Sequence, residues 1–290
     1  MFLVAKPCHW QRFNGVDVNQ SFQLIVTDMD GTLLDAQHCL PSEFVAAVNT
    51  LRQAGIRWVI ASGRQLANLK QRFDALNVPV DIIAENGALA QCAGEAAPFF
   101  CDLTAVSNFT AVLKAALDIP GATPVLCGAT CAWVHDQYPE NLNEVSLYFE
   151  QISTWHHLQE VSALEVCKVA IYHPHAADTL YPALAPFQNE HLRVILSGPN
   201  WVDVQASKVD KSHALHALLK RFNVPPAAVM VFGDYFNDMG MMQGGVHAVA
   251  MANALPEIRA LTPHQTLSNT QNGVMAYLRR LQVLPERISN

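Results

Sequence analysis

Residues 24–35 read LIVTDMDGTLLD and place two aspartates, Asp28 and Asp30, directly after an apolar run. The run predicts a buried strand. Side chains two residues apart in a strand point the same way, so the two carboxylates would repel each other. Burying such a pair is costly unless a cation or a proton lies between them. The stretch therefore predicts a buried strand that ends in two carboxylates, which require a cation or a proton beside them.

The composition is typical of a globular protein. The chain has 290 residues, of which 51% are hydrophobic and 15% charged, enough for a large core and for two domains. A net charge of -7 without a basic block argues against nucleic-acid binding, although a local site can still bind a small anion. No apolar run approaches the roughly 20 residues that span a membrane. We expect no membrane or nucleic-acid partner, and a monomer or weak homodimer.

The seven cysteines include no CxxC pair, which favours free thiols and a cytoplasmic location. Cys127, Cys131 and His135 are spaced four apart and could bind a metal from one helix face, but buried small side chains are the interpretation we favour. Residues 1–21 contain neither a sustained apolar region nor a clear cleavage site. We interpret them as an N-terminal extension and not as a signal peptide.

The first part of the chain alternates between helical and strand patterns. Ser42 is a candidate N-cap and Gly55 a stop for a helix between them. The pattern predicts strands at 24–28, 56–62 and 80–84, with helices at 41–55 and 63–77. Such alternation implies right-handed crossovers and a parallel sheet covered by helices.

A second block of this kind lies near the C-terminus, with helices at 210–223 and 256–261, strands at 229–234 and 246–251, and a short helix or turn at 237–244. Between the two blocks, aromatic and β-branched pieces alternate with helix-like pieces, which indicates an inserted α+β domain. We therefore predict an α/β protein with a Rossmann-like parallel-sheet core, residues 22–90 and 197–290, and an inserted α+β cap domain, residues 91–196.

Polar residues gather at the predicted strand ends and at one helix start. In an open parallel sheet these ends meet near a topological switch point, where ligands bind. Each cluster alone has an ordinary explanation as a turn, a helix cap or surface charge. Their joint order and placement favour one site, which contains Asp28, Asp30, Ser62, Gly63, Arg64, Lys211, Asp234, Asn237 and Asp238.

These residue types suit phosphoryl chemistry. The carboxylates of Asp28, Asp30 and Asp234 offer the hard oxygens that Mg²⁺ prefers. Lys211, the Ser62 hydroxyl and backbone N–H groups can bind a phosphoryl anion. One carboxylate can attack phosphorus while another moves the proton of the leaving group and of water.

In this order, DMDGTLLD, SGR, the lysine of DKSHAL and GDYFND resemble the haloacid dehalogenase (HAD) superfamily, and more closely its Cof-type sugar phosphatase branch. The resemblance extends from about residue 22 to the C-terminal helix. It implies a Mg²⁺-dependent phosphomonoesterase acting on small phosphorylated metabolites, with sugar phosphates first, through an aspartyl-phosphate intermediate. An aspartate at position 30 is typical of the phosphatases and mutases of the superfamily. The 25 or so residues between Asp35 and Ser62 leave no room for a mutase cap.

The resemblance also implies roles. Asp28 would be the nucleophile and Asp30 the general acid and base. Mg²⁺ would be held by the Asp28 side chain, the Asp30 carbonyl and Asp234, supported from behind by Asp238 with Asn237 nearby. Ser62 and Lys211 would bind the phosphoryl oxygens, and the residues beside the substrate would be Gly63, Arg64, Asn86, Gly87 and Asn253.

Three questions stay open at this point. Lys208 is an alternative to Lys211, because the family often has lysine-glycine where this chain has Lys211-Ser212. Alternative functions are a phosphatase for a cofactor or vitamin precursor, a phosphotransferase, and a non-catalytic metabolite-binding protein. The cap side chains that could select the substrate are Trp133, His135, Trp155, His156, His157, Lys168, Tyr172 and His173.

Overall fold

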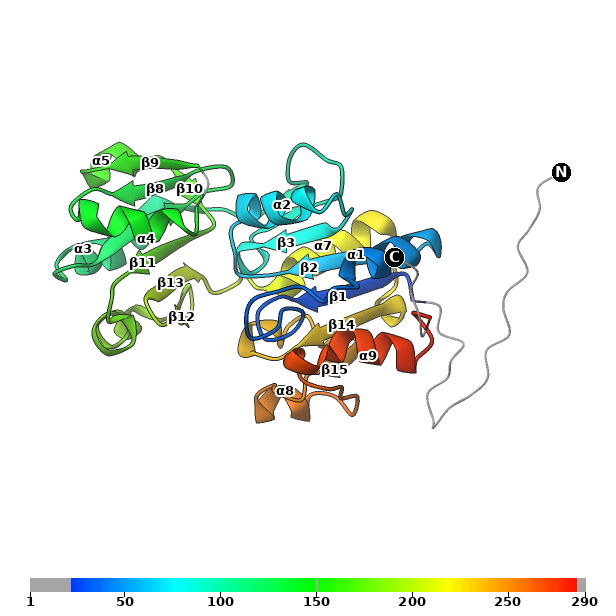
Figure 1. Cartoon of the computed structure of the whole chain (residues 1–290). Coiled ribbons are helices and arrows are strands. Elements are labelled where there is room, and N and C mark those ends of the chain that lie inside the picture. Colours follow the sequence, from blue (N-terminus) through cyan, green and yellow to red (C-terminus); the bar gives the residue numbers. More distant parts are fainter. Residues whose placement is uncertain (1–21, 150, 286–290) are drawn as a thin grey trace.

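Two β-sheets organise the chain (Figure 1). The computed structural model describes residues 22–149 and 151–285. The predicted extension, residues 1–21, lies outside the described residues. Figure 1 shows the second sheet, with α3, α4 and α5 around it, as a lobe beside the first sheet.

The first sheet has seven strands in the order β15-β14-β1-β2-β3-β4-β5. Neighbouring strands are parallel from β15 to β3, while β4 and β5 add an antiparallel edge. Every residue of β1 is buried, as expected for a strand covered on both faces. This confirms the predicted α/β class with a mainly parallel core sheet. The strands are β1 (Leu24–Asp28), β2 (Arg57–Ala61), β3 (Asp81–Ala84), β4 (Leu89–Gln91), β5 (Phe100–Cys101), β14 (Val229–Gly233) and β15 (His247–Ala250).

Helices lie between and after these strands and bury apolar side chains against them. On α1, the ring of Phe44 contacts Trp58 of β2, with ring centroids 5.1 Å apart, and Phe73 of α2. The prediction of Ser42 as the N-cap was wrong, because Glu43 occupies the N-cap position. The Glu43 side chain makes no capping hydrogen bond, and α1 begins at the buried residue Phe44. The helices are α1 (Phe44–Gln53), α2 (Leu66–Ala75), α7 (Lys211–Phe222), α8 (Pro256–Ala260) and α9 (Gly273–Arg280).

The second sheet has the order β12-β13-β11-β7-β8-β9 and is antiparallel except for β8 and β9. Its apolar residues form two further buried clusters, separate from the core of the first sheet. The strands are β7 (Thr123–Cys127), β8 (Ala132–His135), β9 (Ile152–Trp155), β11 (Lys168–Tyr172), β12 (Leu192–Gly198) and β13 (Trp201–Ala206). The helices are α3 (Thr110–Leu117), α4 (Leu142–Ser146), α5 (Leu158–Val161) and α6 (Tyr181–Leu184).

Short elements complete the described chain. A two-stranded ribbon joins β6 (Thr104–Ala105) to β10 (Glu165–Val166). The 3₁₀ turns are η1 (Glu85–Gly87), η2 (Val106–Phe109), η3 (Pro139–Asn141), η5 (Ala185–Phe187), η6 (Pro226–Ala228), η7 (Phe236–Asp238) and η8 (Asn269–Gln271), with a π-turn at η4 (Ala176–Leu180). The predicted short helix after β14 is therefore the single turn η7.

The predicted domain borders differ from the sheet membership. The border at 90/91 cuts β4, and β5 beyond it still pairs with the first sheet. The border at 196/197 cuts β12, which pairs from Leu192 to Gly198 with β13. A hairpin cannot be divided between two sheets without losing its ladder of hydrogen bonds. The second sheet therefore extends to Ala206, and the chain returns to the first sheet just before α7.

Candidate functional site

The predicted polar clusters lie at the carboxyl ends of four neighbouring strands. Asp28 closes β1, Ser62 follows β2, the turn η1 follows β3, and Asp234 follows β14. Because these strands are adjacent and parallel, their carboxyl ends form one edge of the sheet. The structure thus brings together groups that lie up to about two hundred residues apart in the sequence.

Lys211, the first residue of α7, lies at the centre of this edge. Its fully buried ammonium donates to Asp28 Oδ1 at 2.5 Å and to Asp238 Oδ1 at 2.7 Å. Lys208, the alternative lysine, is 66% exposed and pairs with Asp102 at 2.9 Å. The structure therefore places Lys211, and not Lys208, among the carboxylates.

The buried charges strongly perturb one another. Burial and then the charge of Asp238 raise the pKa of Asp28 well above its ordinary value, against the opposing charge of Lys211. Burial also raises the pKa of Asp234 to about 6, although a hydrogen bond from Thr32 opposes this. Burial alone would lower the pKa of Lys211, but the charges of Asp238 and Asp28 raise it overall. The charge of the single Lys211 ammonium thus acts on three carboxylates, those of Asp28, Asp234 and Asp238.

The same carboxylates form a donor set for a cation. One oxygen each of Asp28, Asp234 and Asp238 lies within 4.8 Å of the other two. Carboxylate oxygens are the ligands that Mg²⁺ prefers, and a divalent cation would neutralise the negative charge that Lys211 leaves unbalanced. The residues present therefore fit the group that the sequence led us to expect.

Asp238 organises the turn that follows β14. Its second oxygen, Oδ2, accepts hydrogen bonds from the backbone N–H groups of Asp234 at 2.9 Å and Tyr235 at 3.1 Å. With Oδ1 bound to Lys211, both oxygens of Asp238 have protein partners. The carboxylate thereby fixes the orientation of Asp234 relative to the lysine.

Asp30 lies in different surroundings from Asp28. Its side chain is 42% exposed and accepts from Arg64, through Nε at 2.9 Å and NH2 at 2.6 Å. His38 Nδ1 lies 3.1 Å from the same carboxylate. Burial would raise the pKa of Asp30, but the hydrogen bonds and charge of Arg64, with a smaller contribution from His38, lower it overall. The expectation that both aspartates point the same way was wrong, because β1 ends at Asp28.

The turn after Asp30 is joined to β14 and to the C-terminal segment. Gly31 has φ +87, and a Cβ at this position would collide with the Asp234 carboxylate. Thr32 Oγ1 donates to Asp234 Oδ1 at 2.7 Å, a contact that sequence analysis did not predict. Asn253 Nδ2 donates to the Gly31 carbonyl at 2.8 Å, and its Oδ1 accepts from Asn269 N at 3.0 Å. Asn253 therefore supports this turn from outside.

The loop after β2 packs against the turn after β3. Buried Ser62 accepts from the Arg64 N–H at 3.1 Å through its hydroxyl. A Cβ at Gly63 would lie 2.9 Å from Asn86 Oδ1, so glycine permits this close approach. Asn86 has φ 54, a conformation that asparagine tolerates, and accepts from Asn237 Nδ2 at 3.2 Å. The predicted substrate-side residues are thus adjacent to one another.

Gly87 lets the start of α7 approach the sheet. Its φ is +101, and a Cβ there would collide with the Asp210 carbonyl. Asp210 caps α7 by accepting from the backbone N–H groups of Ser212 at 2.8 Å and His213 at 3.2 Å. Glycine at 87 and the cap at 210 together position Lys211 beside Asp28.

Most of the cap candidates have partners within the cap. His156 pairs with Asp136 at 2.7 Å, and Trp155 Nε1 donates to the Trp133 carbonyl at 3.1 Å. The ring nitrogens of His135 and His173 lie near cap carbonyls at 3.1 and 3.2 Å, and His157 lies in the capping box of α5. Of the eight candidates, Lys168 is the one for which the described residues show a hydrogen bond to the core, namely to the Gly63 carbonyl in the loop after β2.

The spacing of Cys127, Cys131 and His135 does not correspond to one helix face. Cys127 ends β7, His135 ends β8, and Cys131 lies in the hairpin between them. Burial raises the pKa of Cys127 well above the ordinary thiol value. Within residues 22–149 and 151–285, these three side chains do not form a metal-binding group. They are cap packing residues.

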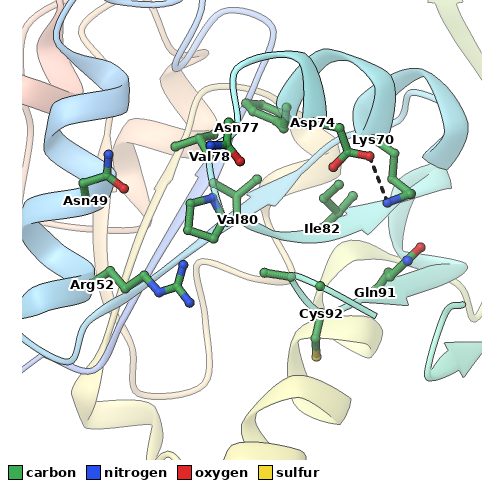
Figure 2. A pocket seen from close by; sticks show the side chains of 14 residues that line it. Asn49, Arg52, Lys70, Asp74, Asn77, Val78, Val80, Ile82, Gln91 and Cys92 are labelled. Atoms are coloured by element: carbon green, nitrogen blue, oxygen red, sulfur yellow. Dashed lines mark ion pairs between the residues drawn. The ribbon is translucent and has the colours of Figure 1, made fainter. Parts of the chain in front are cut away.

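A cavity of about 510 Å³ lies away from this edge, near the amino end of β3 and beside residues of α1 and α2 (Figure 2). Figure 2 shows Arg52, Lys70 and Asp74 around it, with Val80 and Ile82 of the β3 region. Its lining contains none of the predicted site residues. The residues predicted from the sequence therefore lie at the carboxyl edge and not around this cavity.

Known proteins resemble this chain over most of its length. Residues 25–278 match a family model described as haloacid dehalogenase-like hydrolase. The 5-amino-6-(5-phospho-D-ribitylamino)uracil phosphatase YbjI of Escherichia coli (strain K12) is 27% identical over 264 residues, 88% of this chain and 94% of that protein. The HMP-PP phosphatase of Cronobacter sakazakii is 26% identical over 238 residues, 82% of this chain and 86% of that protein.

The fold is also similar to that of a solved HAD subclass IIB sugar phosphatase, BT4131. The superposition has a TM-score of 0.71 at 19% identity and covers 90% of this chain and 100% of that chain. At this identity the likeness concerns the fold alone.

No helix in the described part of the chain is long and apolar enough to cross a membrane.

Proposed function

Because this chain belongs to the haloacid dehalogenase-like hydrolases and is a phosphatase of that family, we propose that it is a Mg²⁺-dependent phosphomonoesterase of small phosphorylated metabolites, with sugar phosphates as the first substrate class. The observation that carries the proposal is the buried Lys211 ammonium between Asp28 and Asp238, at 2.5 and 2.7 Å. A site that only bound a metabolite would need neither this oriented carboxylate nor Asp30 beside it.

In the proposed reaction Asp28 attacks phosphorus with one carboxylate oxygen. The new Asp28 oxygen–phosphorus bond forms as the ester P–O bond breaks. Asp30, which is ionised while it is paired with Arg64, takes up a proton once it has left Arg64 and gives that proton to the departing oxygen. Ionised Asp30 then takes a proton from water, whose oxygen attacks phosphorus and displaces Asp28. Bound Mg²⁺ would supply positive charge against the phosphoryl oxygens, with Asp28, the Asp30 carbonyl and Asp234 to hold it.

The surrounding residues position the phosphoryl group in this proposal. Lys211 neutralises and orients Asp28, and the Ser62 hydroxyl with the N–H groups of its loop binds phosphoryl oxygens. Asp30 must leave Arg64 to reach the leaving group. This movement is feasible because the Asp30–Arg64 pair is partly exposed.

We further propose that the unit built on the second sheet is a cap that selects the substrate. Two relatives favour a second candidate substrate class, phosphorylated precursors of cofactors or vitamins, since their names specify a ribitylaminouracil phosphate and HMP-PP. The proposal includes a cytoplasmic location, supported by the free state of the six described cysteines.

The test is a panel of sugar phosphates, phosphorylated cofactor precursors and nucleotides, with released phosphate as the readout. We expect turnover with Mg²⁺ and none after chelation, with one substrate class clearly preferred. Consumption of substrate with little free phosphate in the presence of an acceptor alcohol would instead indicate a phosphotransferase. No turnover across the whole panel would indicate a non-catalytic binding protein and overturn the proposal.

A further inference from the structure

A second group of buried charges lies where the second sheet meets the first. Lys168 begins β11, and its ammonium lies 2.9 Å from Asp203 Oδ2 in β13 and 3.1 Å from Glu85 Oε2 in η1. The same ammonium donates to the Gly63 carbonyl at 3.0 Å. Lys168 is 7% exposed, Asp203 4% and Glu85 0%. This cluster therefore connects cap and core with little exposure to water.

The pairing of β11 with β13 in the cap sheet determines which residues lie beside Lys168. Ala170 of β11 lies opposite Asp203 of β13, and Lys168 lies two residues before Ala170, on the same face. Lys168 and Asp203 are thus diagonal neighbours at the end of the cap sheet that faces the core. Asp203 supplies the charge that allows an ammonium to be buried there.

On the core side, Glu85 depends on this lysine. It has φ 50, an uncommon conformation for glutamate, and its buried carboxylate is paired with the Lys168 ammonium at 3.1 Å. Burial raises the pKa of Glu85, and the charge of Lys168 opposes this. An unpaired carboxylate at this depth is costly, so Lys168 stabilises the turn after β3 as well as the loop after β2.

The loop that Lys168 contacts is the proposed phosphate-binding loop. Gly63 lies between Ser62, whose hydroxyl accepts from Arg64 N, and Arg64, whose side chain pairs with Asp30. A donor on the Gly63 carbonyl limits the rotation of the peptide unit that joins Gly63 to Arg64. One cap side chain therefore restrains the loop whose N–H groups and hydroxyl would face the phosphoryl oxygens.

We propose that Lys168 is a positioning residue that fixes the Ser62–Arg64 loop for phosphate binding and links its position to that of the cap. This inference rests on the proposed phosphatase function. Lys168 acts through the loop and not on the leaving group, so its loss lowers phosphoryl binding and turnover by the same factor for small and large substrates.

The experiment compares Lys168→Met, Lys168→Arg and Lys114→Met, the last being an exposed lysine in α3 of the same cap. We expect Lys168→Met to reduce kcat/KM by about 10–100-fold, the usual effect of removing a group that orients binding residues. The factor should be equal for an aryl phosphate and a sugar phosphate. Lys168→Arg should recover most of the activity, and Lys114→Met should match the wild type.

Loss of Lys168 leaves two buried carboxylates together, so the triple variant Lys168→Met, Glu85→Gln, Asp203→Asn is included to remove the unpaired charge while keeping the side-chain volumes. It should show the same kinetic defect. Hydrogen exchange of the peptide covering Ser62–Arg64 should increase in both variants without any substrate. This readout does not require turnover.

The outcomes separate the two proposals. If the wild type hydrolyses no phosphate ester, the proposed function fails, whatever the exchange data show. If the wild type is active but the folded triple variant keeps full kcat/KM and unchanged exchange at residues 62–64, the role of Lys168 is overturned. A defect confined to the larger substrate would also overturn it, because Lys168 would then contact the leaving group.

Discussion

Asp28 and Asp30 are the same residue type two positions apart, yet their surroundings differ in almost every respect. Asp28 is buried, bound to Lys211 and close to two further carboxylates. Asp30 is 42% exposed and forms a two-bond pair with Arg64. The Asp28 carboxylate is held in place by the buried charges around it, which can rearrange only if a cation binds. The exposed Asp30–Arg64 pair can open at small cost.

This contrast explains how one short motif can serve two chemical tasks. A nucleophile must be held in one orientation and be ionised when it attacks. The Lys211 ammonium orients Asp28, and its charge opposes the burial and the Asp238 charge that raise the pKa of Asp28. An acid and base must exchange protons with its surroundings, which the exposure of Asp30 permits. The strand that ends between them, at Asp28, separates the two environments.

Replacing the nucleophile should give the largest effect. We expect Asp28→Asn to reduce phosphate release by at least about 10⁴-fold, since the amide cannot form the acyl phosphate. Because burial raises the pKa of Asp28, the ionised carboxylate is unfavourable in the fold, and the neutral amide should leave the metal-free melting temperature at neutral pH no lower than that of the wild type. Activity above a hundredth of the wild-type value in the folded variant would exclude Asp28 as the nucleophile.

Removing the central ammonium should affect both activity and stability. Lys211→Met leaves three carboxylates without their cation, which should cost about 3–5 kcal/mol of unfolding free energy and about 10³-fold in turnover. Mg²⁺ should recover part of the lost stability, as measured by urea unfolding. Lys208→Met is the matched control, since Lys208 is exposed and pairs with Asp102. An equal loss in both variants would contradict the assignment of Lys211.

The core site could be predicted from the sequence because its residues lie at positions that topology alone brings together. Parallel strands have their carboxyl ends at one edge, so Asp28, Ser62 and Asp234 could be placed there from the strand pattern. The direction of the Asp30 side chain could not, since alternation applies only while the strand continues. The strand ends at Asp28, and Arg64 then decides where Asp30 lies.

The cap was less predictable for a similar reason. The predicted border at 196/197 falls inside β12, and no change in composition marks the actual return to the first sheet after β13. Lys168 was one of eight cap candidates, and nothing local distinguished it. Its partners Gly63 and Asp203 lie 105 and 35 residues away, so only the packing of cap against core reveals the contact.

Cation binding should release protons from the buried cluster near pH 6. The pKa of Asp234 is raised to about 6, so close to half of this carboxyl is protonated at that pH and must ionise to bind Mg²⁺. Calorimetric titration with Mg²⁺ in buffers of different ionisation enthalpy should show proton release at pH 6 from Asp234 and Asp28, both of whose pKa values are raised, and this release should fall as the pH rises. A release that is independent of pH would place the cation on other groups. Asp234→Asn should reduce the proton release.

The exposed pair should give the smallest effect. Arg64 lowers the pKa of Asp30 below its ordinary value, so the pair stabilises the fold above the unfolded pKa of about 3.9, and this contribution is lost as the pH falls through the folded pKa. Because Asp30 is 42% exposed, solvent screening limits the contribution to about 1 kcal/mol or less. Urea unfolding of Arg64→Ala should therefore show a small deficit at pH 7 that shrinks at pH 3.5 and in high salt.

Lys70→Ala is the matched control, since Lys70 pairs with Asp74 on the surface of α2 at 3.2 Å. Its deficit should likewise be below about 1 kcal/mol and sensitive to salt. A deficit of several kcal/mol for Arg64→Ala, unchanged by salt, would mean that the Asp30–Arg64 pair is as rigid as the Asp28–Lys211 pair. Asp30 could then not leave Arg64 during turnover, and the division of tasks between the two aspartates would fail.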